Sequence, residues 1–236
     1  MLRFKDMDIQ INGRSLVRTK SMELGSGIIA LVGSNGSGKS TFIRTILGRH
    51  AEYKGEISLF EEPIGSIDKN ELAKLIAVVF SQGNVFGDIK VRNVLGMGRL
   101  PYLNHFAQEK EKDIEIIDKV VGLLELENLL EKSFNHLSDG QRQLVMIGRA
   151  LVQDTPVILL DEPGAFLDVV NKHKVMTALR KIANEQEKII LFSTHSFTFL
   201  DDICDRVLLI DKGDVKELSP SVGFENQVLT HFGIIE

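Results

Sequence analysis

The chain has 236 residues, of which 43% are hydrophobic and 26% charged, a composition typical of an ordinary globular protein rather than a disordered or fibrous one. Its formal net charge of −5, without a basic stripe, argues against a nucleic-acid partner, because such binding relies on clustered Lys and Arg. A single cysteine excludes an intramolecular disulfide, and neither a signal peptide nor a run of about 20 apolar residues is found, so we expect a cytoplasmic protein that reaches a membrane only through a partner.

The first chemical feature lies in residues 28–41, IIALVGSNGSGKST, where an apolar run precedes a glycine-rich turn and the start of a helix. Gly33, Gly36 and Gly38 allow backbone N–H groups to turn inward around phosphate oxygens. Lys39 can reach the β- and γ-phosphates, and the Ser40 hydroxyl can ligate Mg²⁺. This is the complete P-loop pattern in the context that it requires. The predicted nucleotide-binding residues are Gly33, Ser34, Asn35, Gly36, Ser37, Gly38, Lys39, Ser40 and Thr41.

Between Gln82 and Ser138 the pattern is helical, with apolar residues at three- and four-residue spacing in KVRNVLGMGRL and in QEKEKDIEIIDKVVGLLELENLL. A further helix is predicted to begin in NHLSDGQRQ, where Ser138 and Gly140 open it. A helix N-terminus attracts anions, so this start is a second candidate phosphate site. Taken alone, LSDGQ is simply a helix cap, and that alternative stays open here.

Two adjacent carboxylates follow a predicted buried strand in VILLDEPGAFLD, residues 157–168. Because neighbouring residues on a strand face opposite sides, Asp161 and Glu162 are predicted to do different work. Asp161 suits Mg²⁺ coordination through a water, whereas Glu162 suits the general base that polarises the attacking water. His195, after the apolar strand IILFST, can donate a hydrogen bond to a γ-phosphate as a neutral imidazole. The alternatives are two solvated acids at a strand end and a structural histidine.

Together these segments resemble the nucleotide-binding subunits of ATP-binding-cassette (ABC) transporters over essentially the whole chain. GSNGSGKST resembles the Walker A motif, Gln82 in VVFSQGN the Q-loop glutamine, and LSDGQ the family signature. ILLDEP is similar to Walker B, AFLD ending at Asp168 to the D-loop, and STHS around His195 to the switch histidine. The order and spacing of all these motifs make the resemblance specific.

The resemblance implies an α/β fold, a P-loop NTPase core of ABC type with an antiparallel β subdomain and an inserted helical subdomain. It implies one nucleotide-binding domain over residues 1–236, with the core at about 1–82 and 155–236 and the helical subdomain at about 83–154. In the family, two domains pair head to tail, and the P-loop of one and the signature helix of the other clasp one ATP. The implied residues are Glu162 and His195 for catalysis, Ser40, Gln82 and Asp161 for Mg²⁺, and Ser138, Gly140, Gln141 and Asp168 in trans.

The chain departs from the family pattern at the start of the signature helix and in the segment before the phosphate loop. Asp139 stands where many members have glycine, and a carboxylate aimed at phosphate would be repulsive, so Asp139 is expected to point away and to cap the helix. Residues 6–17, DMDIQINGRSLV, contain no aromatic ring to stack on adenine, and Ile11 is the best-aligned candidate for that place. Nucleotide discrimination is therefore expected to be loose.

The resemblance implies an ATPase that uses ATP and Mg²⁺, forms a homodimer and drives integral membrane permease subunits from the cytoplasmic face of the cell membrane. VRNVLGMGRLPYLNHF, residues 91–106, resembles the importers of iron–siderophore, haem, cobalamin or metal ions, which implies an extracytoplasmic substrate-binding protein. Leu100 stands where an aromatic residue is usual, and Arg99 with Pro101 would end a helix in any protein. The alternatives are another transport system, importer or exporter, a soluble ABC ATPase acting on DNA or ribosomes, and a non-hydrolytic sensor. The presence of both Glu162 and His195 disfavours the sensor.

Overall fold

The computed structural model describes residues 1–48, 52–81, 87–103 and 110–234. Its strands form one sheet in the order β6-β5-β1-β2-β11-β10-β4-β9-β8-β7, and β3 pairs with β1 beside this path. The strands are β1 (Leu2–Ile11), β2 (Arg14–Thr19), β3 (Met22–Leu24), β4 (Gly27–Val32), β5 (Tyr53–Leu59), β6 (Glu62–Pro63), β7 (Ile76–Val79), β8 (Val157–Asp161), β9 (Ile189–Thr194), β10 (Arg206–Asp211) and β11 (Asp214–Glu217).

The strands that carry the candidate site form the parallel half of the sheet. β10, β4, β9, β8 and β7 pair with one another in parallel. All six residues of β4 and all five of β8 are buried, as expected for strands covered on both faces. Because parallel strands end at the same edge, the loops after β4, β8 and β9 meet there. This edge therefore brings together segments that are far apart in the sequence.

The antiparallel half consists of β1, β2, β3, β5 and β6. Asn12 and Gly13 both have positive φ and join β1 to β2 in a tight hairpin. β11 connects the two halves, because it pairs antiparallel with β10 and parallel with β2. The expected antiparallel subdomain is thus continuous with the parallel sheet through β11.

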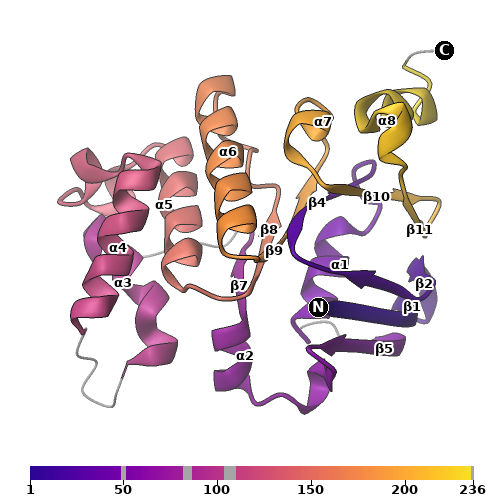
Figure 1. Cartoon of the computed structure of the whole chain (residues 1–236), viewed down its shortest axis with the longest axis horizontal. Helices are drawn as coiled ribbons and strands as arrows, with labels where there is room; N and C mark the ends of the chain where they lie inside the picture. Colours follow the sequence, from indigo (N-terminus) through magenta and orange to yellow (C-terminus); the bar gives the residue numbers. More distant parts are fainter. Residues whose placement is uncertain (49–51, 82–86, 104–109, 235–236) are drawn as a thin grey trace.

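The helices cover the sheet on both faces and extend beyond one end of it. Figure 1 shows α3, α4 and α5 grouped at the left, the antiparallel strands at the right, and α6 between them. The helices are α1 (Lys39–Ile46), α2 (Lys69–Leu75), α3 (Val91–Gly96), α4 (Glu111–Leu124), α5 (Asp139–Val152), α6 (Val169–Glu185), α7 (Leu200–Ile203) and α8 (Phe224–His231).

Two apolar clusters fill the interior. One joins α3, α4, α5 and α6 to one face of the parallel strands, for example through Val145, Leu160 and Leu179. The other packs α1 and the antiparallel strands together, with the Phe4 and Phe42 rings 5.3 Å apart. The helical region therefore shares its core with the parallel sheet.

A buried ion pair holds the helical region together. Arg99 Nε donates to Asp113 Oδ1 at 2.8 Å, Arg99 Nη1 donates to the Val152 carbonyl at 2.9 Å, and the guanidinium lies 4.1 Å from the centre of the Tyr102 ring. Both side chains of the pair are less than 10% exposed. α3 ends at Gly96, before Arg99, and a 3₁₀ helix continues from Met97 to Tyr102 with Pro101 inside it. Arg99 therefore lies in the last turn of the 3₁₀ helix, which ends one residue after Pro101, and in addition to this place at a helix end it is a buried bridge between segments.

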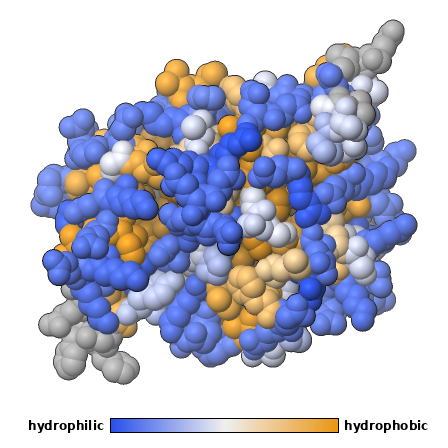
Figure 2. Space-filling model, viewed as in Figure 1, coloured by the Kyte–Doolittle hydropathy of each residue, from blue (hydrophilic) through white to orange (hydrophobic). Residues whose placement is uncertain are grey.

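Within the described residues, no helix has the length and apolar character needed to cross a membrane. Hydrophilic residues cover most of the face seen in Figure 2, and apolar residues show between them.

Candidate active site

The turn between β4 and α1 has the shape of a phosphate cradle. Gly36 and Gly38 have φ values of 78° and 102°, which favour glycine, and Gly38 precedes α1 without a side-chain cap. Gly33 does not have positive φ; it is needed because a Cβ there would lie 2.6 Å from Ser37 Oγ. Ser37 Oγ is buried and has no hydrogen-bond partner among the described residues, so it suits a phosphate oxygen as partner. Uncapped N–H groups and this hydroxyl fit a bound phosphate.

Lys39 is the first residue of α1, and its side chain reaches back to the carbonyl groups of this loop. Its Nζ donates to the Gly33 carbonyl at 2.8 Å and to the Ser34 carbonyl at 3.1 Å, and the residue is only 5% exposed. Burial lowers the pKa of Lys39, although the nearby carboxylates of Glu162 and Asp161 oppose this shift. The loop therefore presents a cation beside two carboxylates.

Asp161 ends β8 and joins the phosphate loop to β9. The residue is 2% exposed, and its Oδ1 accepts from Ser40 Oγ at 3.0 Å and from Ser193 Oγ at 2.6 Å. Ser193 is a partner that sequence reasoning missed, although it lies opposite Asp161 in the register of β8 and β9. A serine hydroxyl and a carboxylate are hard oxygen ligands, which fit Mg²⁺.

Within residues 1–48, 52–81, 87–103 and 110–234, no group of three or more His, Cys, Asp or Glu side chains is arranged to hold a metal ion by itself. A magnesium ion that keeps waters and takes its other ligands from phosphates needs no such cluster. Ser40 and Asp161 would hold the ion on the protein side. Gln82, the third predicted ligand, lies outside the described residues.

Glu162 follows β8 directly and has φ of 51°, in the left-handed region. Its N–H donates to Ser193 Oγ at 2.9 Å. The sequence predicted that Asp161 and Glu162 point to different sides because neighbouring residues alternate along a strand. In the structure the strand ends at Asp161 and the chain turns at Glu162, so this turn separates the two side chains instead. A non-glycine residue in this conformation is strained, and such residues gather at functional sites.

The Glu162 side chain meets His195 at the end of β9. Glu162 Oε2 lies 2.9 Å from His195 Nδ1, and the two side chains are 24% and 55% exposed. Because a carboxylate only accepts, Nδ1 must carry a proton in this contact. The ring can then donate through Nε2 only as an imidazolium. A neutral ring that donates through Nε2, as expected from the sequence, would first have to leave Glu162.

The signature segment forms a capping box at the start of α5. Ser138 Oγ accepts from the Gln141 N–H at 3.3 Å, and Gln141 Oε1 accepts from the Ser138 N–H at 3.2 Å. Ser138 is therefore the cap, and the expectation that Asp139 caps the helix is wrong. The Asp139 carboxylate instead pairs with Arg142 at 3.3 Å, one turn further along the exposed surface.

Gly140 places the signature helix directly against the segment after Glu162. A Cβ on Gly140 would lie 2.9 Å from the Phe166 carbonyl oxygen, so only glycine permits this approach. Asp168, two residues further on, caps α6 by accepting from the Asn171 N–H at 2.7 Å. Three apolar residues near Asp168 are exposed: Phe166 by 52%, Val169 by 71% and Val170 by 73%. Neighbouring exposed apolar residues of this kind are typical of a contact surface.

Ile11, the candidate for the adenine contact, is 43% exposed at the end of β1. The structure brings two other residues to the phosphate loop. A Cβ on Gly38 would lie 2.4 Å from Val17 Cγ2 and 3.2 Å from Leu16 Cδ2. Sequence reasoning missed Leu16 and Val17, because their contact depends on how β2 packs against the loop. The role of Ile11 stays a prediction.

Comparisons with known proteins relate these features to one family. A family model described as an ABC transporter matches residues 18–165. The hemin import ATP-binding protein of Shewanella denitrificans is 30% identical over 98% of this chain and 90% of its own length. The molybdate import ATP-binding protein of Haemophilus influenzae is 32% identical over 85% of this chain and 75% of its own length. The petrobactin import ATP-binding protein of Bacillus subtilis is 28% identical, over 97% and 91%.

Solved structures agree with these similarities. An inward-facing metal-chelate type ABC transporter aligns with a TM-score of 0.80 and 27% identity, and covers 98% of this chain and 88% of the solved one. The dimeric structure of a bacterial ABC transporter cassette aligns with a TM-score of 0.80 and 25% identity, over 93% of this chain and 99% of the solved one.

Proposed function

The chain belongs to the ABC transporter family, and we propose that it is the ATP-hydrolysing subunit of an importer for an iron–siderophore, haem, cobalamin or a metal ion. ATP is its substrate and Mg²⁺ its cofactor, and it works as a dimer with a membrane permease. The observation that carries the residue roles is the meeting of the Ser40–Asp161 and Glu162–His195 pairs at one edge of the parallel sheet.

Phosphate binding, Mg²⁺ binding and activation of the attacking water are carried out by different residues of the site. The phosphate loop and Lys39 bind the phosphates, and Ser40 and Asp161 hold Mg²⁺, which neutralises phosphate charge when it is bound. Glu162 accepts a proton from the attacking water. His195 contacts Glu162 through Nδ1, which orients the two side chains toward each other, and it donates a hydrogen bond to the γ-phosphate.

The signature helix supplies the second half of the site. The start of α5 carries no lysine or metal ligand in its capping box, so on its own it is a weak anion site. In a homodimer, Ser138, Gly140 and Gln141 of one copy would face the phosphates bound by the other, and Asp168 would lie at the same contact. The exposed apolar side chains next to Asp168 support this interface.

The cargo class is proposed from the relatives. Two of the similar proteins are named for hemin and petrobactin import, and one similar structure is a metal-chelate type transporter. A third relative is named for molybdate import, so the relatives do not share one cargo. We place this chain at the cytoplasmic face of the membrane, with an extracytoplasmic substrate-binding protein delivering the cargo to the permease.

Glu162→Gln tests the catalytic assignment. The substitution keeps the shape of the side chain but removes its basicity, so ATP turnover should fall at least about 100-fold while ATP affinity is retained. The variant should also remain dimeric in ATP, as measured by ultracentrifugation. Turnover equal to that of the unmodified chain would refute the role of Glu162.

Cargo is tested with the native permease and binding protein in liposomes. A ferric siderophore, haem, a cobalamin analogue or molybdate is supplied on the binding-protein side, and ATP turnover is measured. Stimulation by one of the first three, absent in Glu162→Gln, supports the proposed cargo class. Stimulation by molybdate alone contradicts the proposed cargo class, and stimulation by none of the four excludes the siderophore, haem and cobalamin and leaves only a metal ion. Both outcomes leave the ATPase chemistry in place.

A further inference from the structure

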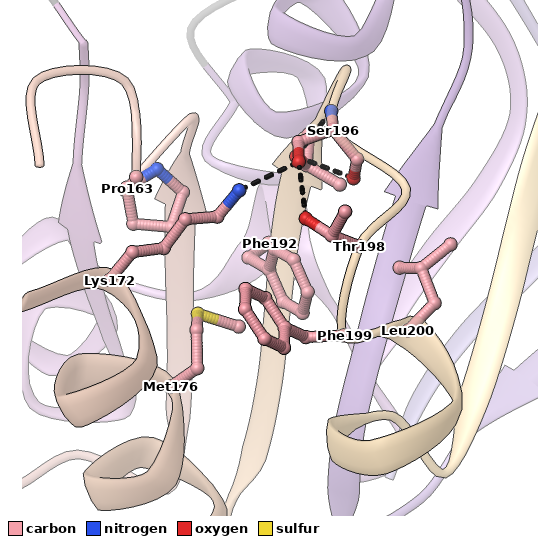
Figure 3. A pocket seen from close by; sticks show the side chains of 10 residues that line it. Pro163, Lys172, Met176, Phe192, Ser196, Thr198, Phe199 and Leu200 are labelled. Atoms are coloured by element: carbon pink, nitrogen blue, oxygen red, sulfur yellow. Dashed lines mark hydrogen bonds between the residues drawn. The ribbon is translucent and has the colours of Figure 1, made fainter. Parts of the chain in front are cut away.

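Lys172 lies in the first turns of α6, below the turn that carries His195. In Figure 3 its side chain runs from α6 past Pro163 toward Ser196. Lys172 Nζ donates to Ser196 Oγ at 2.7 Å. Nothing in the sequence motifs draws attention to this lysine, because its partner is 24 residues away.

The Ser196 contact bears directly on His195. Ser196 Oγ also lies 3.0 Å from Thr198 Oγ1, and the Ser196 N–H donates to Thr194 Oγ1 at 3.0 Å. These bonds close a short polar turn with His195 at its centre. Two side chains reach this turn from other segments: Glu162 contacts His195, and Lys172 donates to Ser196 and so ties the turn to α6.

The same lysine touches the segment that carries Glu162. A Cβ on Gly164 would lie 3.1 Å from Lys172 Cε and 3.2 Å from its Cδ, so the lysine stem passes closely over that glycine. Glu162, His195 and Lys172 also line one cavity of about 80 Å³. The cavity is lined by both polar and apolar atoms, and it is large enough for water. Lys172 therefore contacts both segments whose side chains form the 2.9 Å pair.

α6 further connects Lys172 to Asp168. The Lys172 N–H donates to the Asp168 carbonyl at 2.8 Å, which is the first turn of the helix that Asp168 caps. A helical turn is stiff, so displacement of Asp168 is transmitted to Lys172. Burial lowers the pKa of the Lys172 ammonium, which is consistent with a side chain packed among its neighbours.

We propose that Lys172 is a positioning residue for ATP hydrolysis, which sets the distance between Glu162 and His195 and connects that pair to the Asp168 surface. This inference rests on the proposed roles of Glu162 and His195. Lys172 does not touch the nucleotide in this scheme; it acts through Ser196 and Gly164. Its loss should therefore reduce the rate of the chemical step rather than the affinity for ATP.

The test compares Lys172→Met, Lys172→Arg and Ser196→Ala in the full chain with its permease. Methionine keeps the apolar stem over Gly164 and removes the donor, whereas arginine keeps a donor that can reach Ser196. We expect Lys172→Met and Ser196→Ala each to lower kcat roughly tenfold, with KM for ATP changed less than about threefold. Lys172→Arg should recover at least about a third of the lost rate, and the double variant Lys172→Met with Ser196→Ala should be no slower than either single one.

Glu162→Gln is measured alongside as the reference. If Glu162→Gln loses turnover while Lys172→Met and Ser196→Ala keep kcat within about twofold, the inference on Lys172 is wrong and the proposed role of Glu162 still stands. If Glu162→Gln keeps its turnover, the proposed function of that residue fails and the inference with it. A fall in kcat that arginine does not rescue, or that comes with an equal loss of ATP affinity, would also overturn the positioning role. Should Lys172→Met fail to fold, Ser196→Ala decides, since it removes only a hydroxyl.

Discussion

The N-termini of α1 and α5 are both candidate anion sites, but they differ in whether a side chain caps the helix. α1 begins after Gly38, which has a left-handed conformation and no side chain, and no side chain of the described residues caps the helix. α5 begins at Ser138 with a complete capping box formed by its own side chains. One helix end is left open for a ligand, whereas the other is already partly satisfied.

The residues around the two helix starts also differ. Around the start of α1 lie the buried Lys39, the Ser40–Asp161 bond and the Glu162–His195 pair, which come from three separate segments, α1 and the ends of β8 and β9. The start of α5 faces the Phe166 carbonyl and is flanked by the Asp139–Arg142 pair. From this contrast we infer that the first site binds nucleotide by itself, and that the second adds to a nucleotide already bound by a partner.

The largest expected effect concerns the stability of the helical region. Asp113→Asn leaves Arg99 buried without its counter-charge and should lower the free energy of unfolding by about 3–5 kcal/mol. Because the pair lies in the helical region, the affinity for MgATP of the folded protein should change little. Thermal unfolding and nucleotide titration at one temperature measure the two effects. If Asp113→Asn lowered the free energy of ATP binding as much as the free energy of unfolding, the helical region and the nucleotide site would not be energetically separate.

The loss of stability caused by Asp113→Asn should depend on pH in a defined direction. Burial raises the pKa of Asp113, but hydrogen bonds from the Lys110 N–H and the Arg99 side chain outweigh it and leave the pKa below 3.8, the usual value. A carboxyl group with a depressed pKa in the folded state stabilises the protein above the usual pKa and loses this contribution as pH falls through the folded value. The stability difference between the unmodified chain and Asp113→Asn should be full at neutral pH and should shrink below pH 3.8. A difference that grows on acidification would contradict the assignment.

The next effect concerns the open helix end. Lys39→Met removes the buried ammonium and should weaken MgATP binding by roughly 30- to 100-fold, equivalent to about 2–3 kcal/mol for charge-assisted contacts. Isothermal titration of the monomeric protein measures it. Lys39→Arg is the matched control, because it keeps the charge while changing the shape of the donor. Unchanged affinity in Lys39→Met would show that the loop binds phosphate without this side chain.

The smallest of the three effects concerns the capped helix end. Asp and Asn both cap helices well, but only Ser138→Asp adds a negative charge where a partner's phosphate would arrive. In the Glu162→Gln background, Ser138→Asp should weaken ATP-dependent dimerisation about tenfold relative to Ser138→Asn. ATP affinity of the monomer should be the same in both variants within about twofold. Ultracentrifugation with and without ATP measures the dimer, and equal dimerisation of the two variants would argue against a phosphate at this helix.

Much of the site could be predicted because it consists of consecutive residues. The phosphate loop between β4 and α1, Asp161 at the end of a buried strand and the start of α5 near Ser138 all follow from local backbone preferences and apolar periodicity. The comparisons confirm the resemblance to ABC transporters, the fold class and ATP hydrolysis. These properties are encoded in short stretches of sequence, so the sequence by itself was sufficient to identify them.

Tertiary structure decided which distant residues complete the site. Ser193 reaches Asp161 because β8 and β9 pair in register, and Lys172 reaches Ser196 because α6 packs against β9. Arg99 pairs with Asp113 across two segments, and Glu162 takes a left-handed conformation that strand periodicity could not predict. Each of these contacts depends on how strands align and how side chains pack, which are properties of the folded chain as a whole. Local sequence patterns therefore predicted the individual motifs, whereas packing between distant segments determined how they are joined.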